Sequence, residues 1–213
     1  MKIVHTPVLL NECLEFLSPV GESFEKDALM IDSTLGEGGH SFNFLSKYKN
    51  LKIIGLDADS NIQAKAKVRL AEFGERMNFY NGWFNDFYKN YPEDSRKPNL
   101  ILFDLGISVF HYEESNRGFS FRHDEKLDMR LNQNEGESAA DLVNNLAEEN
   151  LANLIYLYGE EKLSRRIASA IVNARNGSKI ESSKELAEII WNAVPSSYRY
   201  GPIHPATRTF QAL

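Results

Sequence analysis

Three aspartates in this sequence stand where a ligand site is expected, because each ends an apolar run of the kind that forms a buried strand. Asp32 follows "ALMI", Asp57 follows "LKIIGL" and Asp104 follows "NLILF". Apolar strands that alternate with helices form a parallel sheet covered on both faces, and such sheets bind ligands at the carboxyl ends of their strands. Three carboxylates at one such edge therefore predict a binding site there.

A glycine-rich turn follows the first strand, in the stretch "DSTLGEGGHS". Glycine lacks a Cβ and reaches positive φ values, so Gly36, Gly38 and Gly39 let the backbone approach a ligand closely. A helix that begins near His40 directs its free amide groups to the same place. The dinucleotide pattern G-x-G-x-x-G is incomplete here, because Ser41 stands at its last position.

The acidic residues at the strand ends are compatible with two cofactors, NAD and S-adenosylmethionine. Asp57 lies about 20 residues after the turn, where a carboxylate suits the ribose hydroxyls of either cofactor. Asp104 favours S-adenosylmethionine, because a carboxylate attracts its positively charged methionine end and repels a pyrophosphate. Phe84 follows the third strand, where an adenine ring would be sandwiched. Each residue also has a structural interpretation: Asp104 as a loop cap, Asp57 as a solvated strand end, His40 as a helix cap and Phe84 as core.

The first half of the chain alternates between strands and helices, as a covered parallel sheet requires. Thr6 followed by Pro7 predicts the start of a first helix. Apolar runs predict strands over 28–32, 51–57, 77–82 and 99–106, and periodic segments predict helices over 40–48 and 60–73.

The second half is helical only, from about Ser138 onward. Ser138 with Asp141, and Ser182 with Glu185, fit capping boxes. Four periodic segments cover 139–146, 148–159, 161–177 and 183–194. Between the halves lies a long polar and aromatic segment with little periodicity, which is typical of a functional loop.

Composition narrows the class of protein. The chain has 213 residues, a net charge of -6 and five histidines without ligand spacing, so no metal site is predicted. The acidic balance counts against a nucleic-acid binder, although a local basic patch is compatible with it. No apolar stretch reaches the roughly 18 residues of a membrane span. The single cysteine, Cys13, cannot form an internal disulfide, and we expect a cytoplasmic protein.

Several motifs, taken together, resemble one known family, the RsmH (MraW) family. They are "HTPVLLNECLEFL", "DSTLGEGGHS", "DLGIS", "RGFSFRHDEKLDMRLN", "YGEEKLSRRIASAIV", "KELAEII" and "HPATRTFQAL". The resemblance covers essentially the whole chain, and its fourth and seventh stretches are far more specific than the glycine turn. Members of the family are S-adenosylmethionine-dependent methyltransferases that modify N4 of a cytidine in 16S ribosomal RNA of the small subunit.

The resemblance implies a class I, Rossmann-like α/β methyltransferase fold with the strand order 3-2-1-4 and an inserted all-helical domain. The expected divisions are a methyltransferase domain over 1–108, an active-site loop over 109–137, the helical domain over 138–200 and a return to the first domain over 201–213. Family members continue well past "FQAL", so we expect a fold that is incomplete at its C-terminus. The fourth strand would then lack a neighbour, and a second copy or another partner is expected to cover its edge.

The resemblance also assigns roles to individual residues. The implied cofactor contacts are Gly38, Gly39, His40, Asp57 at the ribose, Phe84 near the adenine, Asp104 near the methionine end, and His111, where the family more often has glutamine. From the chemistry of methyl transfer, Asp104 is the candidate acceptor for a proton of the cytidine N4, with Ser108 and the backbone of the "DLGIS" turn as alternatives. Candidate RNA contacts are Arg165, Arg166, Arg199 and Arg208.

Three further questions stay open from the sequence. The aromatic residues of 110–121 either receive a flipped base or pack beneath their loop. The partner is 16S ribosomal RNA or a preformed small-subunit surface. The competing functions are an NAD-dependent oxidoreductase and a non-catalytic remnant that binds RNA or a partner.

Overall fold

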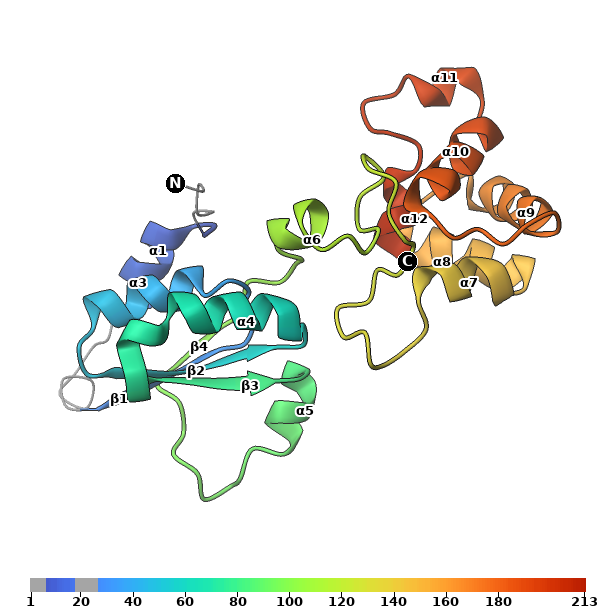
Figure 1. The fold of residues 1–213 in the computed structure, drawn as a ribbon. Coiled ribbons are helices and arrows are strands. Elements are labelled where there is room, and N and C mark those ends of the chain that lie inside the picture. Colours follow the sequence, from blue (N-terminus) through green and yellow to red (C-terminus); the bar gives the residue numbers. More distant parts are fainter. Residues whose placement is uncertain (1–6, 18–26) are drawn as a thin grey trace. The chain divides into compact units, whose positions relative to one another are not determined.

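The computed structural model describes residues 7–17 and 27–213, and Figure 1 shows its helices and strands. The chain divides into two compact units, one up to Val109 and the other from Phe110 to Leu213. Thr6, the predicted helix start, lies outside the described residues. Among the residues that the structure describes, no helix is both long enough and apolar enough to cross a membrane.

The first unit contains a four-stranded parallel sheet in the order β3-β2-β1-β4, which confirms the order expected from the sequence. Its strands are β1 (Ala28–Asp32), β2 (Leu51–Asp57), β3 (Met77–Asn81) and β4 (Leu100–Leu102). The register pairs Asp32 with Gly55 and Leu102. Because the strands are parallel, their carboxyl ends form a single rim, where the glycine turn begins.

Short helices cover this sheet. They are α1 (Leu10–Phe16), α3 (Gly39–Lys47), α4 (Ser60–Arg69), the 3-10 helix η1 (Ala71–Arg76) and α5 (Phe84–Lys89). In Figure 1, α3 and α4 lie over one face of the sheet and α5 lies on the other side. The core under α3 and α4 includes Met30, Phe44, Ile53, Ala66 and Leu70, each with at most 1% of its surface exposed. Cys13 of α1 packs against the same core and stays partly exposed.

Two elements of the first unit are shorter than the sequence predicts. The helix expected over 60–73 ends at Arg69, and η1 follows it with Gly74 at φ 53°. The strand expected over 99–106 is regular only over Leu100–Leu102. Its neighbour β1 ends at Asp32, so the chain beyond Leu102 has no strand beside it to continue the ladder. Helix α5 was not predicted, because its six residues are too few to show a helical period in the sequence.

The second unit is a helical bundle. Its helices are α6 (Val109–Glu113), which begins at the boundary, α7 (Ala139–Asn145), α8 (Glu148–Gly159), α9 (Ser164–Arg175), α10 (Ser183–Ala193), α11 (Ser196–Arg199) and α12 (Thr207–Ala212). The helices α7 to α10 follow the four periodic segments closely. Ser138 and Asp141 form both halves of a capping box. The other box is half formed: Ser182 accepts from the Glu185 N–H, while the Glu185 carboxylate accepts from the N–H of Glu181.

The loop expected over 109–137 packs almost entirely with the second unit. Arg117 is 4% exposed and donates to the carbonyl oxygens of Arg130 and Leu131, at 2.8 and 3.1 Å. Two hydrogen bonds from the Arg130 guanidinium lower the pKa of Asp128 to about 2. Gly118 has φ 78°, and a Cβ there would lie 2.6 Å from a backbone oxygen. These contacts give a long aperiodic segment a fixed fold.

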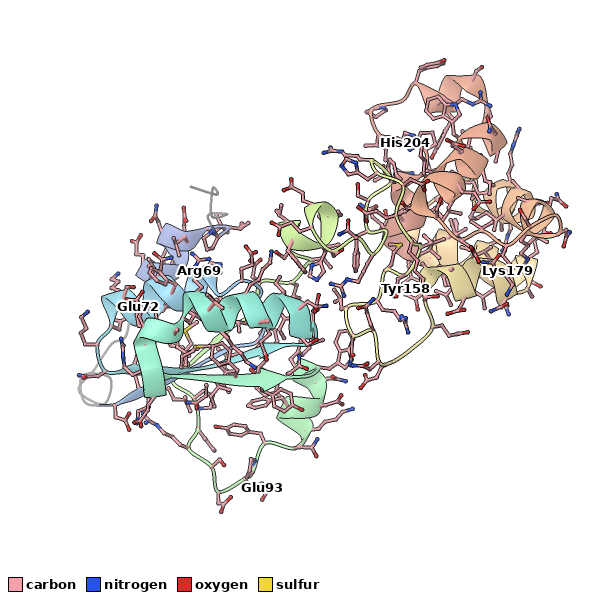
Figure 2. The ribbon with its side chains drawn as sticks, in the orientation of Figure 1. Arg69, Glu72, Glu93, Tyr158, Lys179 and His204 are labelled. Carbon is pink, nitrogen blue, oxygen red and sulfur yellow. The ribbon has the colours of Figure 1, made fainter. Side chains whose placement is uncertain are left out.

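Residues 201–213 also pack within the second unit, and the return to the first domain expected from the sequence stays a prediction. Ala206 is fully buried in the helical core, and the Phe210 ring lies 5.0 Å from the ring of Phe121. His204, labelled in Figure 2, stacks on Trp191 at 5.3 Å and lies 4.6 Å from Phe121. Burial of apolar surface against α8 and α10 explains why this segment stays with the bundle.

The close approach of α8 and α12 at Gly159 predicts a sharp stability effect. A Cβ on Gly159 would lie 2.3 Å from the carbonyl oxygen of Arg208, so Gly159→Ala must separate the two helices. We expect a loss of about 1–3 kcal/mol in the free energy of unfolding, measured by urea titration. Gly177→Ala is the matched control, because a Cβ there meets its nearest atom at an ordinary 3.6 Å. Equal losses in the two variants would contradict the prediction.

Candidate functional site

The end of β1 is tied to its surroundings by three consecutive side chains. Each forms a hydrogen bond with a different element: α3, α5 and the segment after β4. The bonds run from Ser41 Oγ to Asp32 Oδ2 (2.7 Å), between Ser33 Oγ and Tyr88 Oη (2.8 Å), and from the Asp104 N–H to Thr34 Oγ1 (2.7 Å). The rim is therefore held by side chains where the ladder between strands has ended.

The glycine turn is packed too tightly for side chains. Gly38 caps α3 at φ 77°, and a Cβ on it would lie 2.7 Å from Leu70 Cδ1. A Cβ on Gly39 would lie 2.5 Å from Cγ of Pro7, just ahead of α1. The backbone of this turn lies at the ligand edge of the sheet, and the first amides of α3 point toward that edge.

Asp57, at the end of β2, connects the glycine turn to the next loop. Its Oδ2 accepts from the Gly36 N–H at 2.9 Å, and its Oδ1 accepts from the Asp59 N–H at 2.8 Å. The Gly82 N–H bonds its backbone oxygen, which places the end of β3 beside it. A carboxylate oxygen accepts more than one hydrogen bond, so Asp57 retains acceptor capacity for the hydroxyls of a ribose.

Phe84 begins α5, immediately after the loop that follows β3. The side chain is half-buried, and its ring meets the ring of Phe103 edge to face, at 5.4 Å and 84°. Phe103 also contacts Tyr88, at 6.0 Å. This aromatic group beside the Asp57 loop offers a flat surface to a planar ring such as adenine.

His40 and Asp104 lie together on the other side of the glycine turn. His40 is 7% exposed, and its Nε2 lies 3.8 Å from Asp104 Oδ2. Burial lowers the pKa of His40, and the charge of Asp104 opposes that shift. In the described structure, His40 Nδ1 is buried without a hydrogen-bond partner. The Asp104 side chain is 47% exposed, so its carboxylate is accessible from the rim.

Asp32 differs from the other two rim carboxylates, since it is only 1% exposed. Burial raises the pKa of Asp32 to about 6, and the nearby charges of Asp57 and Asp104 add to the shift. Hydrogen bonds from Ser41 and from the Thr34 N–H partly oppose it. Asp32 therefore supports the rim from beneath, and its buried carboxyl group is not accessible to a ligand.

The structure places the remaining predicted residues in the second unit. His111 is 4% exposed, with its ring 5.1 Å from Phe119 and 5.5 Å from Phe110. Phe110 and Phe119 are themselves buried, so these aromatics pack beneath their loop, while Tyr112 is 46% exposed. A cofactor contact from His111 stays a prediction.

The four arginines proposed for RNA binding all donate to backbone carbonyl groups. Their acceptors are Glu149 for Arg165, Ala193 for Arg166, Val194 and Asn192 for Arg199, and Glu160 for Arg208. Carbonyl groups near helix C-termini carry partial negative charge, so most of these guanidinium groups stabilise helix ends. A role in RNA binding is untested by these contacts.

Comparison with known proteins shows that residues 2–213 match the sequence model of the MraW methylase family. The chain belongs to the MraW methylase family. It is 58% identical to "Ribosomal RNA small subunit methyltransferase H" of Treponema denticola over 213 residues, which cover 100% of this chain and 66% of that protein.

Other relatives of this MraW chain carry the same name. The protein of Borrelia hermsii is 48% identical over 213 residues, 99% of this chain and 70% of that protein. The protein of Borreliella burgdorferi is 45% identical over 98% of this chain and 69% of its own length. The chain thus spans about two thirds of the length of these relatives. The parallel sheet and its flanking helices agree with the Rossmann-like fold expected from the sequence.

Within this methylase fold, sequence reasoning missed the supporting residues of the rim. Ser33, Thr34, Ser41 and Tyr88 contribute three hydrogen bonds there, yet serine, threonine and tyrosine are common in turns and short helices. The only available signal was the polar triplet directly after the apolar run of β1. Their partners come from residues up to 70 positions away, which a local pattern does not reveal.

The buried carboxyl of Asp32 predicts a specific dependence of stability on pH. An unfolded aspartate has a pKa near 3.9, and the folded value is about 6. The folded state therefore binds more protons between these values, and the stabilisation present below pH 4 is lost as the pH rises through 6. Asp32→Asn removes this titration, so the difference in unfolding free energy between wild type and variant falls by roughly 2–3 kcal/mol from pH 4 to pH 7.

Urea titrations of both proteins across this range measure the effect. Ser41→Ala supplies the second variant: it removes a hydrogen bond that favours the ionised carboxylate, so the transition should move to higher pH. A difference between wild type and Asp32→Asn that stays constant from pH 4 to pH 7 would show that Asp32 does not titrate in this window.

Proposed function

We propose that this chain forms the cofactor site and helical unit of an S-adenosylmethionine-dependent methyltransferase that acts on N4 of a cytidine in 16S ribosomal RNA. The observation that carries the proposal is the set of groups gathered at the carboxyl ends of the strands in this member of the MraW family. They are a close-packed glycine turn, a proposed ribose acceptor at Asp57 and an accessible acid at Asp104. The names of the relatives, which are ribosomal RNA methyltransferases, supply the substrate class.

The donor set of the rim fits this cofactor. In the proposed complex, the backbone of Gly38, Gly39 and His40 would lie against the middle of the cofactor. Asp57 would accept hydrogen bonds from the ribose hydroxyls, and Phe84 would lie against the adenine ring. Asp104 attracts the cationic methionine end, and the bound cofactor supplies an electrophilic methyl group in an in-line displacement. Neither an NAD-dependent oxidoreductase nor a non-catalytic remnant gains support from the comparisons.

Asp104 is the proposed proton acceptor for the reaction. The N4 lone pair of cytosine is conjugated with the ring, so an acceptor for an N4 hydrogen raises its nucleophilicity. The Asp104 carboxylate is accessible, and its backbone N–H is fixed by Thr34. Ser108 and the backbone of the same turn are the alternative acceptors. The target base reaches this place unstacked, because a paired base hides its N4.

The proposed partner is the small ribosomal subunit or its RNA, in the cytoplasm. A net charge of -6 indicates weak attraction to free RNA, which favours a preformed subunit surface as substrate. The edge formed by β4 and the residues just after it carries a second proposal. Ile101 of β4, and Phe103 and Leu105 beyond it, are 44, 45 and 74% exposed, which supports a partner or second copy that covers this edge.

Cofactor identity is tested by thermal shift. S-adenosylmethionine and S-adenosylhomocysteine should each raise the melting temperature of the purified chain, since a ligand that binds only the folded state stabilises it. NAD at the same concentration should leave it unchanged, because its pyrophosphate would lie near Asp104. A shift with NAD alone would replace the methyltransferase proposal with the oxidoreductase.

The role of Asp104 is tested with Asp104→Asn. At saturating S-adenosylmethionine, methyl transfer to small subunits should fall by about 100-fold or more, because the amide accepts no proton. Calorimetry should still detect cofactor binding, weakened by about tenfold through loss of one charge. Unchanged turnover at saturating cofactor would remove Asp104 as the acceptor and leave Ser108 as the candidate.

A further inference from the structure

We propose that Thr34 is a positioning residue that holds Asp104 at the rim through the hydrogen bond to its backbone. The inference rests on the proposed function, in which Asp104 attracts the cationic end of the cofactor. It adds Thr34, a residue to which the proposed function assigns no role. The bond in question joins the Asp104 N–H to Thr34 Oγ1 at 2.7 Å.

Asp104 needs such support because its own segment has little beyond the ring contacts of Phe103 with Phe84 and Tyr88. The strand β4 ends at Leu102, and Leu105 is 74% exposed. Gly106 follows with φ 150°, and no atom lies within 4 Å of the position of a Cβ on it. A chain that has left its sheet and buries little apolar surface is held mainly by its polar contacts.

Thr34 itself is on rigid backbone. The N–H of Ser33 bonds the oxygen of Leu102 on one side at 2.9 Å, and the N–H of Leu35 bonds the oxygen of Leu56 on the other at 2.9 Å. The turn is thus fastened to β4 and to β2 directly before and after Thr34. The Thr34 hydroxyl accepts a hydrogen bond from the Asp104 N–H and so restrains Asp104, whose own backbone no longer pairs with a strand.

A second contact explains how the direction of the carboxylate is set. His40 Nε2 lies 3.8 Å from Asp104 Oδ2, and His40 is buried in the first turn of α3. Thr34 fixes the backbone of Asp104, and His40 faces its carboxylate. Both residues come from the loop and helix after β1, so one turn places the charge that meets the cofactor.

The test uses variants that differ by a single group. Thr34→Val replaces the hydroxyl with a methyl group of similar size, and leaves the Asp104 N–H without its acceptor. Thr34→Ser keeps the hydroxyl. Ser33→Ala is the matched control, because it removes the neighbouring hydroxyl, which bonds Tyr88 and not Asp104. Each change is made in the wild-type chain and in Asp104→Asn, and calorimetry measures the dissociation constant for S-adenosylmethionine.

Thr34→Val should weaken cofactor binding by about three- to tenfold in the wild-type chain, and by less than about twofold in Asp104→Asn. Thr34→Ser should stay within about twofold of its parent, and any effect of Ser33→Ala should be the same in both backgrounds, because that hydroxyl bonds Tyr88. An equal effect of Thr34→Val in both backgrounds would overturn the proposal, because Thr34 would then act independently of Asp104. A loss in Ser33→Ala that also disappears in Asp104→Asn would overturn it as well, because the cause would be a general loosening of the turn.

Amide hydrogen exchange separates this proposal from the proposed function. The Asp104 amide of the ligand-free chain should exchange faster in Thr34→Val and at the wild-type rate in Thr34→Ser. If the wild-type chain binds no S-adenosylmethionine, the proposed function fails, whatever the exchange result. If the cofactor binds and Asp104 exchanges equally fast in wild type and Thr34→Val, only the role of Thr34 fails.

Discussion

A parallel sheet needs further contacts where its strands stop pairing, and this chain supplies them with the last residue of β1 and the two residues that follow it. Asp32, Ser33 and Thr34 reach α3, α5 and the turn that carries Asp104. Asp57 makes the corresponding contact from β2 to the glycine turn. The rim is therefore a network of side-chain hydrogen bonds between loops, and these bonds help to keep the accessible acids in position.

This arrangement carries a stability cost at neutral pH. Asp32 is buried near two other carboxylates, so its ionisation is opposed by burial and by like charge. In the second unit, the pKa of a carboxyl group is shifted in the opposite direction. Arg130 and Gln133 donate hydrogen bonds to Asp128 and favour its charged form. A positively charged ligand at the rim would reduce the repulsion between Asp32 and the other two carboxylates. Ligand binding is therefore coupled to the free-energy cost of ionising Asp32 in the folded state.

Periodicity and strand-end acids were sufficient to predict the parallel sheet and the helices α7 to α10, because each depends on local patterns of apolar residues. The order of the strands came from the resemblance to the family, since it depends on contacts between distant segments. The reasoning from local patterns placed Asp57 and Asp104 at one edge. It overestimated β4, whose length depends on where β1 ends, and it did not find the hydrogen bond of Thr34. The arginines illustrate the limit: a charged residue on a helix looks solvent-exposed in sequence, while its acceptor on another helix is set by packing.

The position of Cys13 has a practical consequence. It is the single cysteine of the chain, and it lies on α1, the helix preceded by the proline that packs on Gly39. Burial raises the pKa of its thiol, so alkaline buffer favours its reaction with a maleimide dye. A fluorophore attached there would label α1 without any engineered mutation, and its emission would be a direct probe of ligand binding at the rim.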